Sequence, residues 1–165
     1  MEPVRGRMQL VEYGQPFRVV VDFAHTPNAL RLTLETLRED CRERLIAVIG
    51  HPCGRDRQSR PQLGGVAAQL CDFFVIAGDD PYDEEPESIL VEIAAGARAA
   101  GSIEGRDFVR ISDRRMAFAE AFEYARPGDT VLPAGRGHLS QWVSRGHKTP
   151  FDDALLAGSL LWSFR

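Results

Sequence analysis

The sequence has almost no lysine, little cysteine and no long apolar run. Lys148 is the only lysine among the 20 basic residues, and it does not belong to a G-K-S or G-K-T run. A Walker-type phosphate loop requires that lysine, so this chain cannot supply one. Three cysteines, Cys41, Cys53 and Cys71, cannot all pair, and none lies in a C-x-x-C unit. That usage favours a reducing cytoplasm over a secreted scaffold.

The chain also lacks the features of a membrane or nucleic-acid-binding protein. Residues 1–5 (MEPVR) contain no apolar signal region, and no apolar stretch approaches membrane-spanning length. The net charge of −4 argues against a general nucleic-acid surface, which would be basic. A length of 165 residues with 44% hydrophobic and 27% charged residues fits one globular domain, residues 1–165. We therefore expect a cytoplasmic, single-domain protein that binds neither membranes nor nucleic acids.

Short apolar segments alternate with helical patterns along nearly the whole chain. Strands are predicted at residues 18–23, 45–49, 73–77, 108–111 and 130–132. Helices are predicted between them from apolar residues at helical spacing, and a last helix is expected after Asp152 or Asp153. The first helix should begin at Thr26-Pro27, an N-cap followed by proline at the first helical position. Wholly apolar strands alternating with amphipathic helices indicate a Rossmann-like α/β fold, a mostly parallel open sheet with helices on both faces.

Ligands of such sheets gather at the carboxyl ends of the strands, where this chain has four polar or glycine-rich loops. The first loop delivers Asp22 and His25 to the helix that begins at Pro27. The free N–H groups of that helix favour an anion or a nucleotide. A plain N-cap with a histidine over the helix end explains the same residues. The last loop, residues 135–138 (GRGH), lets the backbone approach a ligand closely, although many turns share its pattern.

The two middle loops carry opposite charges. Three arginines, Arg55, Arg57 and Arg60, could hold a carboxylate or phosphate, or could be solvated beside Asp56. The acidic loop at residues 78–86 could receive an ammonium group, or could be a turn before a helix. His51 and Cys53 are too few ligands for a structural zinc site, so no metal site is predicted.

In combination these loops resemble the Mur ligases, and their muramoyl-tripeptide synthetases most closely. Residues 21–30 (VDFAHTPNAL) resemble the family's V-D-Y-A-H-T-P-D-A-L, and residues 54–61 (GRDRQSRP) resemble G-D-R-D-x-x-K-R-P. Residues 79–86 (DDPYDEEP) and 134–138 (AGRGH) are similar to D-N-P-R-x-E-x-P and A-G-K-G-H-E. Residues 150–153 (PFDD) resemble the segment before the family's last helix. The order and spacing agree from about Gly6 to the end of the chain.

The resemblance implies the C-terminal domain of a bacterial three-domain ligase. In that family ATP phosphorylates the carboxylate of a UDP-MurNAc-dipeptide, and the amine of an amino acid displaces the phosphate to form an amide. The N-terminal and central domains would be further partners of this chain. The central domain would carry the phosphate loop and most contacts to ATP and Mg²⁺, so this chain alone is expected to be inactive. Residues 2–17 resemble the segment after the central domain, which makes Met1 an added start residue.

The family's site residues transfer to specific positions of this chain. Asp22, His25 and Pro27 fall on the motif that approaches ATP. Arg55 falls on the arginine that contacts the carboxylate of the incoming amino acid. The remaining amino-acid-binding positions, in the acidic loop and the last loop, are Asp79, Asp80, Tyr82, Gly135 and His138. None of these residues is expected to be a general base by itself.

Several positions depart from the family pattern. Tyr82 replaces the arginine that reads the distal carboxylate of meso-diaminopimelate, and Asp80 replaces an asparagine. An acidic loop without that arginine suits a diamino acid that ends in an ammonium, such as L-lysine or L-ornithine. Leu139 stands where the family has a glutamate, and His51-Pro52-Cys53 stands in place of a glycine-rich turn. Two alternatives stay open, a folylpolyglutamate- or cyanophycin-type ligase and a non-catalytic Rossmann-like binding module.

Overall fold

The computed structural model describes residues 4–164. Met1, interpreted from the sequence as an added start residue, lies outside the described part, as do Glu2 and Pro3. Among the described residues, six strands form one sheet in the order β1-β2-β6-β3-β4-β5, and two more form a separate hairpin. β1 is antiparallel to β2 and the other pairings in the sheet are parallel. The strands are β1 (Gln9–Leu10), β2 (Arg18–Val21), β3 (Leu45–Ile49), β4 (Phe73–Ala77), β5 (Phe108–Ile111), β6 (Thr130–Pro133), β7 (Gln141–Ser144) and β8 (His147–Pro150).

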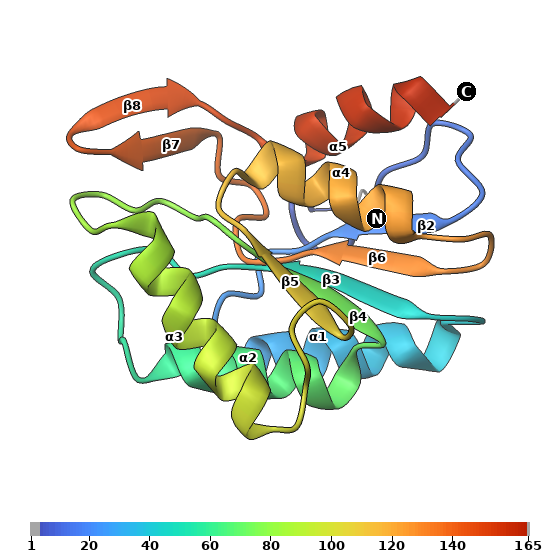
Figure 1. Cartoon of the computed structure of the whole chain (residues 1–165). Helices are drawn as coiled ribbons and strands as arrows, with labels where there is room; N and C mark the ends of the chain where they lie inside the picture. Colours follow the sequence, from blue (N-terminus) through green and yellow to red (C-terminus); the bar gives the residue numbers. More distant parts are fainter. Residues whose placement is uncertain (1–3, 165) are drawn as a thin grey trace.

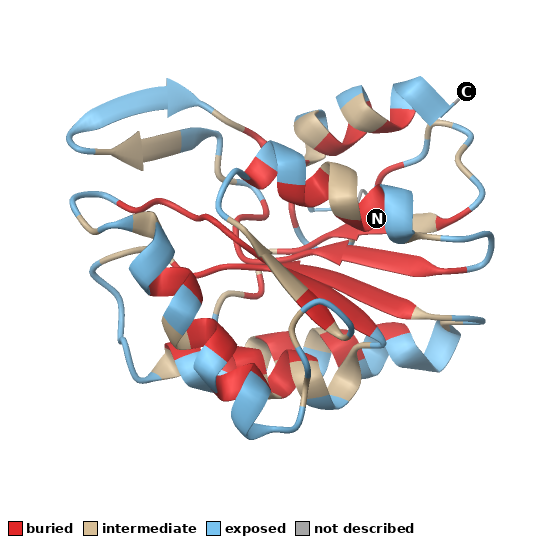
Figure 2. Ribbon diagram, in the orientation of Figure 1, coloured by how far each residue is buried: buried red, intermediate tan, exposed pale blue. Residues whose placement is uncertain are grey.

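Helices cover both faces of the sheet, as Figure 1 shows. They are α1 (Pro27–Asp40), α2 (Ser59–Leu70), α3 (Pro86–Ala99), α4 (Arg114–Tyr124) and α5 (Asp153–Leu161), followed by a short 3₁₀ turn. α1, α2 and α3 share one apolar core with the sheet, and α4 and α5 share the other. The four inner strands, β2, β6, β3 and β4, are almost entirely buried between the two cores (Figure 2), whereas the edge strands β1 and β5 are mostly half-buried or exposed. The three-layer fold predicted from the alternating pattern is therefore confirmed.

The predicted helix starts follow from local hydrogen bonding. Thr26 caps α1 by accepting a hydrogen bond from Ala29 N at 3.2 Å, and Pro27 occupies the first helical position. Asp152, one of the two expected caps, accepts from Leu155 N at 3.0 Å at the start of α5. The side-chain oxygen in each case satisfies an N–H group that has no partner inside the helix.

Three details differ from the sequence-based prediction. β2 ends at Val21 rather than residue 23, because the chain turns after a single further bridge from Asp22 to Ala134. Ala125, expected on the fourth helix, is its C-cap. The hairpin of β7 and β8 was not predicted, because β8 is polar and exposed and offers no apolar alternation.

The hairpin lies beside the acidic loop that follows β4. Its two-residue turn uses positive φ at Arg145 (47°) and Gly146 (74°), the conformation that two-residue hairpin turns favour. Tyr82 N donates to Val143 O at 3.2 Å, and Arg145 N donates to Tyr82 O at 2.6 Å. The hairpin therefore fixes the backbone of Tyr82, which itself has a positive φ of 48°.

α2 and α3 approach one another closely at glycine. A Cβ added to Gly64 would overlap Ile93 O and lie 2.9 Å from Ala97 N, and one added to Gly96 would overlap Pro61 O. The two helices are therefore packed backbone against backbone. No helix among residues 4–164 is long and apolar enough to cross a membrane.

Candidate functional site

The four loops after β2, β3, β4 and β6 meet around one small cavity of about 150 Å³. Parallel strands place their carboxyl ends at the same edge of the sheet, which is why residues as far apart in sequence as Phe23 and Leu139 line the same cavity. Six of the nine predicted site residues line this cavity, namely His25, Arg55, Asp79, Asp80, Tyr82 and Gly135. Phe23, Pro52 and Leu139 complete its wall.

The other three predicted residues lie outside the cavity lining. Asp22 is buried, and its two carboxylate oxygens accept from Met8 N and Ala24 N, each at 2.8 Å. It therefore fastens the N-terminal segment to the turn before α1. Pro27 lines a different depression, between α1 and α2. His138 is exposed, and its ring packs 4.9 Å from the ring of Phe23 at the rim of the cavity.

The two ring nitrogens of His25 differ in their hydrogen bonding. Its Nδ1 lies 3.0 Å from Phe23 O, and a carbonyl only accepts, so Nδ1 must carry the proton. Nε2 of the neutral ring is then free to accept a hydrogen bond. The ring also packs 4.6 Å from the ring of Phe23, whose face receives the Arg7 guanidinium at 4.9 Å.

The three arginines of the second loop have different surroundings. Arg55 is exposed, lines the cavity and forms no ion pair within residues 4–164. Arg57 pairs with Glu92 on α3. Arg60 is fully buried and binds Glu84 with two hydrogen bonds, of 2.8 and 2.7 Å. Only Arg55 is therefore free to bind an anion in the cavity.

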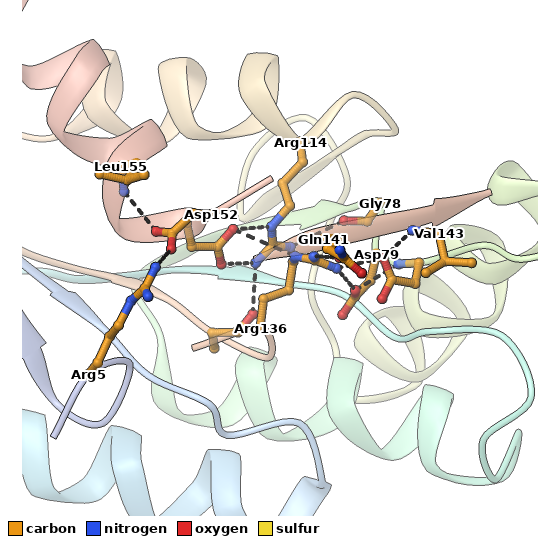
Figure 3. A network of polar contacts seen from close by, with 12 residues as sticks. Arg5, Gly78, Asp79, Arg114, Arg136, Gln141, Val143, Asp152 and Leu155 are labelled. Carbon is orange, nitrogen blue, oxygen red and sulfur yellow. Dashed lines mark hydrogen bonds and ion pairs between the residues drawn. The ribbon is translucent and has the colours of Figure 1, made fainter. Parts of the chain in front are cut away.

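Asp79 and Asp80 already have a cationic partner, which the sequence-based prediction missed. Arg136, fully buried, donates from Nη1 to one oxygen of each carboxylate at 2.8 Å, and from Nη2 to Gln141 O at 2.6 Å (Figure 3). The rings of Trp142 and Phe151 lie 5.1 and 5.4 Å from its guanidinium carbon. In the sequence, the glycines on either side of Arg136 in the GRGH motif were the only sign that this arginine belongs to a site. Its carboxylate partners, Asp80 and Asp79, are 56 and 57 residues away.

A second buried arginine supports the first from the α4 side. Arg114 binds Asp153 through two hydrogen bonds, of 2.9 and 2.6 Å, and donates to Gly78 O and Ala134 O (Figure 3). Burial is the largest single influence on Arg114 and opposes its charge, but the charge and hydrogen bonds of Asp153, together with the charges of Asp79 and Asp80, raise the pKa of Arg114 overall. The pair joins the N-termini of α4 and α5 to the ends of β4 and β6.

The buried charges of the site do not cancel. Asp79, Asp80 and Asp153 carry three negative charges when ionised, whereas Arg114 and Arg136 carry two positive ones. These five side chains leave one negative charge, beside the cavity that Arg55, Asp79 and Asp80 line. Asp79 and Asp80 are called the acidic wall of the cavity; a small ligand that contacts both Arg55 and this acidic wall would carry a carboxylate for Arg55 and an ammonium for the acidic wall.

The residues that could bind a metal ion are few. No group of three or more His, Cys, Asp or Glu side chains within residues 4–164 is arranged to hold one. The carboxylates nearest the cavity are instead bound to arginine.

Fold and site together define a Rossmann-like α/β domain with a small cavity, lined by charged residues, at the carboxyl edge of its sheet. The sequence model for "Mur ligase, glutamate ligase domain" matches residues 6–137, and the chain belongs to the Mur ligase family.

The relatives described next belong to one branch of the family, the tripeptide synthetases and diaminopimelate ligases. The chain is 43% identical over 151 residues to a UDP-N-acetylmuramyl-tripeptide synthetase of Roseiflexus sp. (strain RS-1), covering 92% of this chain and 30% of that protein. It is 41% identical over 161 residues to a UDP-N-acetylmuramoyl-L-alanyl-D-glutamate–2,6-diaminopimelate ligase of Syntrophomonas wolfei, covering 98% and 32%. A solved structure of such a diaminopimelate ligase superposes with a TM-score of 0.86 at 32% identity, covering 99% and 33%. The folylpolyglutamate- and cyanophycin-type alternatives are not favoured.

Proposed function

We propose that this chain binds the incoming amino acid in an ATP-dependent ligase that adds the third residue to UDP-MurNAc-L-Ala-D-Glu. The chain spans about a third of the length of these relatives, so the catalytic cycle belongs to a longer protein. The observation that carries the proposal is that Arg55, which forms no ion pair within residues 4–164, and the buried carboxylates of Asp79 and Asp80 line the same cavity of about 150 Å³. An α-amino acid carries the two complementary charges.

Each wall has a defined role in this proposal. Arg55 binds the α-carboxylate, because its planar guanidinium matches the two oxygens. Asp79 and Asp80 use Oδ1 for Arg136, which leaves an Oδ2 on each carboxylate for an ammonium group. Gly135, with φ of 106°, lets the backbone run close to Asp79 Oδ2 without a side chain in between. Leu139 offers no carboxylate, so it contributes only apolar contact.

The charge balance supports L-lysine or L-ornithine as the amino acid added. Tyr82 lines the cavity and has no cationic group, so the structure has no arginine at that position to read a second carboxylate. The second candidate is 2,6-diaminopimelate, which the names of several relatives favour. The two candidates differ by one distal carboxylate, which makes them separable by a substrate panel.

ATP and Mg²⁺ are bound mainly by the rest of the ligase. This chain has no phosphate-loop lysine, and its described carboxylates form no metal cluster. His25 Nε2 and the exposed His138 are the groups that would approach ATP from this side. In this proposal the chain acts by positioning the amine and stabilising charge, in the cytoplasm of a bacterium and together with the N-terminal and central domains. By itself the chain releases no phosphate.

The test is amino-acid-dependent phosphate release by the full-length ligase supplied with ATP, Mg²⁺ and UDP-MurNAc-L-Ala-D-Glu. Turnover with lysine or ornithine, but not diaminopimelate, is the expected result. Turnover with diaminopimelate alone would establish the second candidate. Arg55→Lys should raise KM for the amino acid, whereas Arg42→Lys, an exposed arginine at the other end of the sheet, should not. The absence of turnover with any amino acid would leave the chain as a non-catalytic binding module.

A further inference from the structure

Arg60 is not among the residues that line the cavity, yet it contacts the loop that carries Arg55 and the loop that carries the acidic wall. Its side chain is fully buried at the start of α2. Besides the two bonds to Glu84, Nη1 donates to Glu92 at 3.1 Å and Nε donates to His51 Nδ1 at 3.3 Å. One guanidinium therefore joins the loop after β3, the loop after β4 and helix α3.

The contact with His51 defines the state of that histidine. Arg60 Nε can only donate, so His51 Nδ1 must accept and His51 Nε2 must carry the proton. Nε2 then donates to Ser59 Oγ at 2.9 Å, and Ser59 Oγ donates to Asp56 O at 2.6 Å. Burial, and then the charge of Arg60, lower the pKa of His51, which keeps the ring neutral. Hydrogen bonds within the loop that carries Arg55, and from Arg60 to His51, therefore hold this loop in place.

Glu84 provides the connection to the opposite wall. Its hydrogen bonds with Arg60 lower its pKa to about 2, so it is ionised at neutral pH. Glu84 lies two residues after Tyr82, in the loop that also carries Asp79 and Asp80. The backbone repeats the connection, since Cys53 N donates to Asp80 O at 2.9 Å. The Arg60–Glu84 pair and this backbone hydrogen bond therefore both link the loop that carries Arg55 to the loop that carries the acidic wall.

The pair has a rigid base. α2 begins at the Arg60 end and α3 begins just after Glu84, and the two helices are packed glycine against backbone at Gly64 and Gly96. Neither helix can slide to compensate for a change in the ion pair. A lysine at position 60 would keep the charge, but a single ammonium cannot form the two parallel bonds to Glu84 and also reach His51.

We propose that Arg60 is a positioning residue, which sets the separation of the two cavity walls and thereby the affinity for the incoming amino acid. This inference rests on the proposed function. Arg60 does not touch the substrate in this proposal; it acts through His51 on the Arg55 loop and through Glu84 on the acidic loop.

The test measures KM for the amino acid, KM for ATP and kcat of the full-length ligase with Arg60→Lys and, separately, Glu84→Gln. Both should raise KM for the amino acid about tenfold or more, because small displacements of binding groups are costly, and should change kcat and KM for ATP less than about threefold. Phosphate release is followed with whichever amino acid, L-lysine or meso-diaminopimelate, the unmodified ligase uses.

The matched control is Arg44→Lys. Arg44 also binds a buried carboxylate, Asp129, through several hydrogen bonds, but at the opposite edge of the sheet. The Arg44→Lys variant should have a lower Tm and an unchanged KM for both the amino acid and ATP. If Arg60→Lys also lowers Tm and leaves KM for the amino acid unchanged, Arg60 is only structural and the inference is wrong. An unmodified ligase without amino-acid-dependent phosphate release would refute the proposed function instead.

Discussion

Gly64 and Gly65 are neighbours on α2, and an added methyl group should have opposite effects at the two positions. At Gly64 the new Cβ would overlap Ile93 O, a backbone atom that cannot rotate away. At Gly65 the nearest atom is Gly96 O at 3.9 Å, an ordinary contact distance. Both substitutions gain the same helix propensity, so the difference between them isolates the contact between the helices.

The magnitudes follow from two terms. Replacing glycine with alanine inside a helix stabilises by about 0.5–1 kcal/mol. Overpacking costs about 1–3 kcal/mol, and the upper end applies at Gly64 because the obstacle is backbone. Gly64→Ala should therefore destabilise the chain by about 2 kcal/mol net, and Gly65→Ala should stabilise it by about 0.5–1 kcal/mol. For a chain of this size the Tm should fall by roughly 4–8 °C in the first variant and rise by a few degrees in the second.

Urea unfolding of the 165-residue chain at pH 7, followed by circular dichroism, measures both differences. Gly96→Ala should destabilise like Gly64→Ala, because its Cβ would overlap Pro61 O across the same interface. The double variant of Gly64 and Gly96 should lose less than the sum, since helices already separated by one methyl group accommodate the second. Equal effects of Gly64→Ala and Gly65→Ala, in either direction, would refute the close packing of α2 and α3.

Three further predictions concern the buried charges and the cavity. Arg114→Met leaves the buried carboxylate of Asp153 with only Arg136 Nε, at 4.0 Å, as a cationic partner and should destabilise by about 3–5 kcal/mol in urea, whereas the double variant with Asp153→Leu should recover most of that loss. The pKa of Glu84 is lowered from 4.5 to about 2, so its stabilisation is complete above pH 4.5 and is lost as the pH falls towards 2. The lowered pKa of His51 adds a contribution to the unfolding free energy that is complete above pH 6.5 and is lost on acidification. The unfolding free energy should therefore fall below pH 6.5 and again below pH 4.5. Glu84→Gln should reduce the second of these two decreases. Tyr82→Arg should raise kcat/KM for diaminopimelate relative to lysine by about tenfold or more in a competition assay with the full-length ligase; an unchanged ratio, equal to that of Tyr82→Phe, would show that this position does not select the amino acid.

The sequence by itself determined the order of the elements and the edge of the sheet at which the site forms. Apolar strands and helical spacing are local patterns, and the caps at Thr26 and Asp152 depend on neighbours within three residues. Because parallel strands end at one edge of a sheet, the strand pattern alone predicts that the loops carrying His25, Arg55 and Asp79 meet there. The cavity at that edge agrees with the expectation.

Only the tertiary structure decided which charges in those loops are free. Arg55 and Arg60 belong to the same short motif, yet one lines the cavity and the other is buried against Glu84. Likewise Arg136 forms ion pairs with Asp79 and Asp80 from a position more than 50 residues away. No local pattern distinguishes these arginines, because an ion pair depends on the direction in which each side chain leaves its loop, and packing of the whole domain sets that direction.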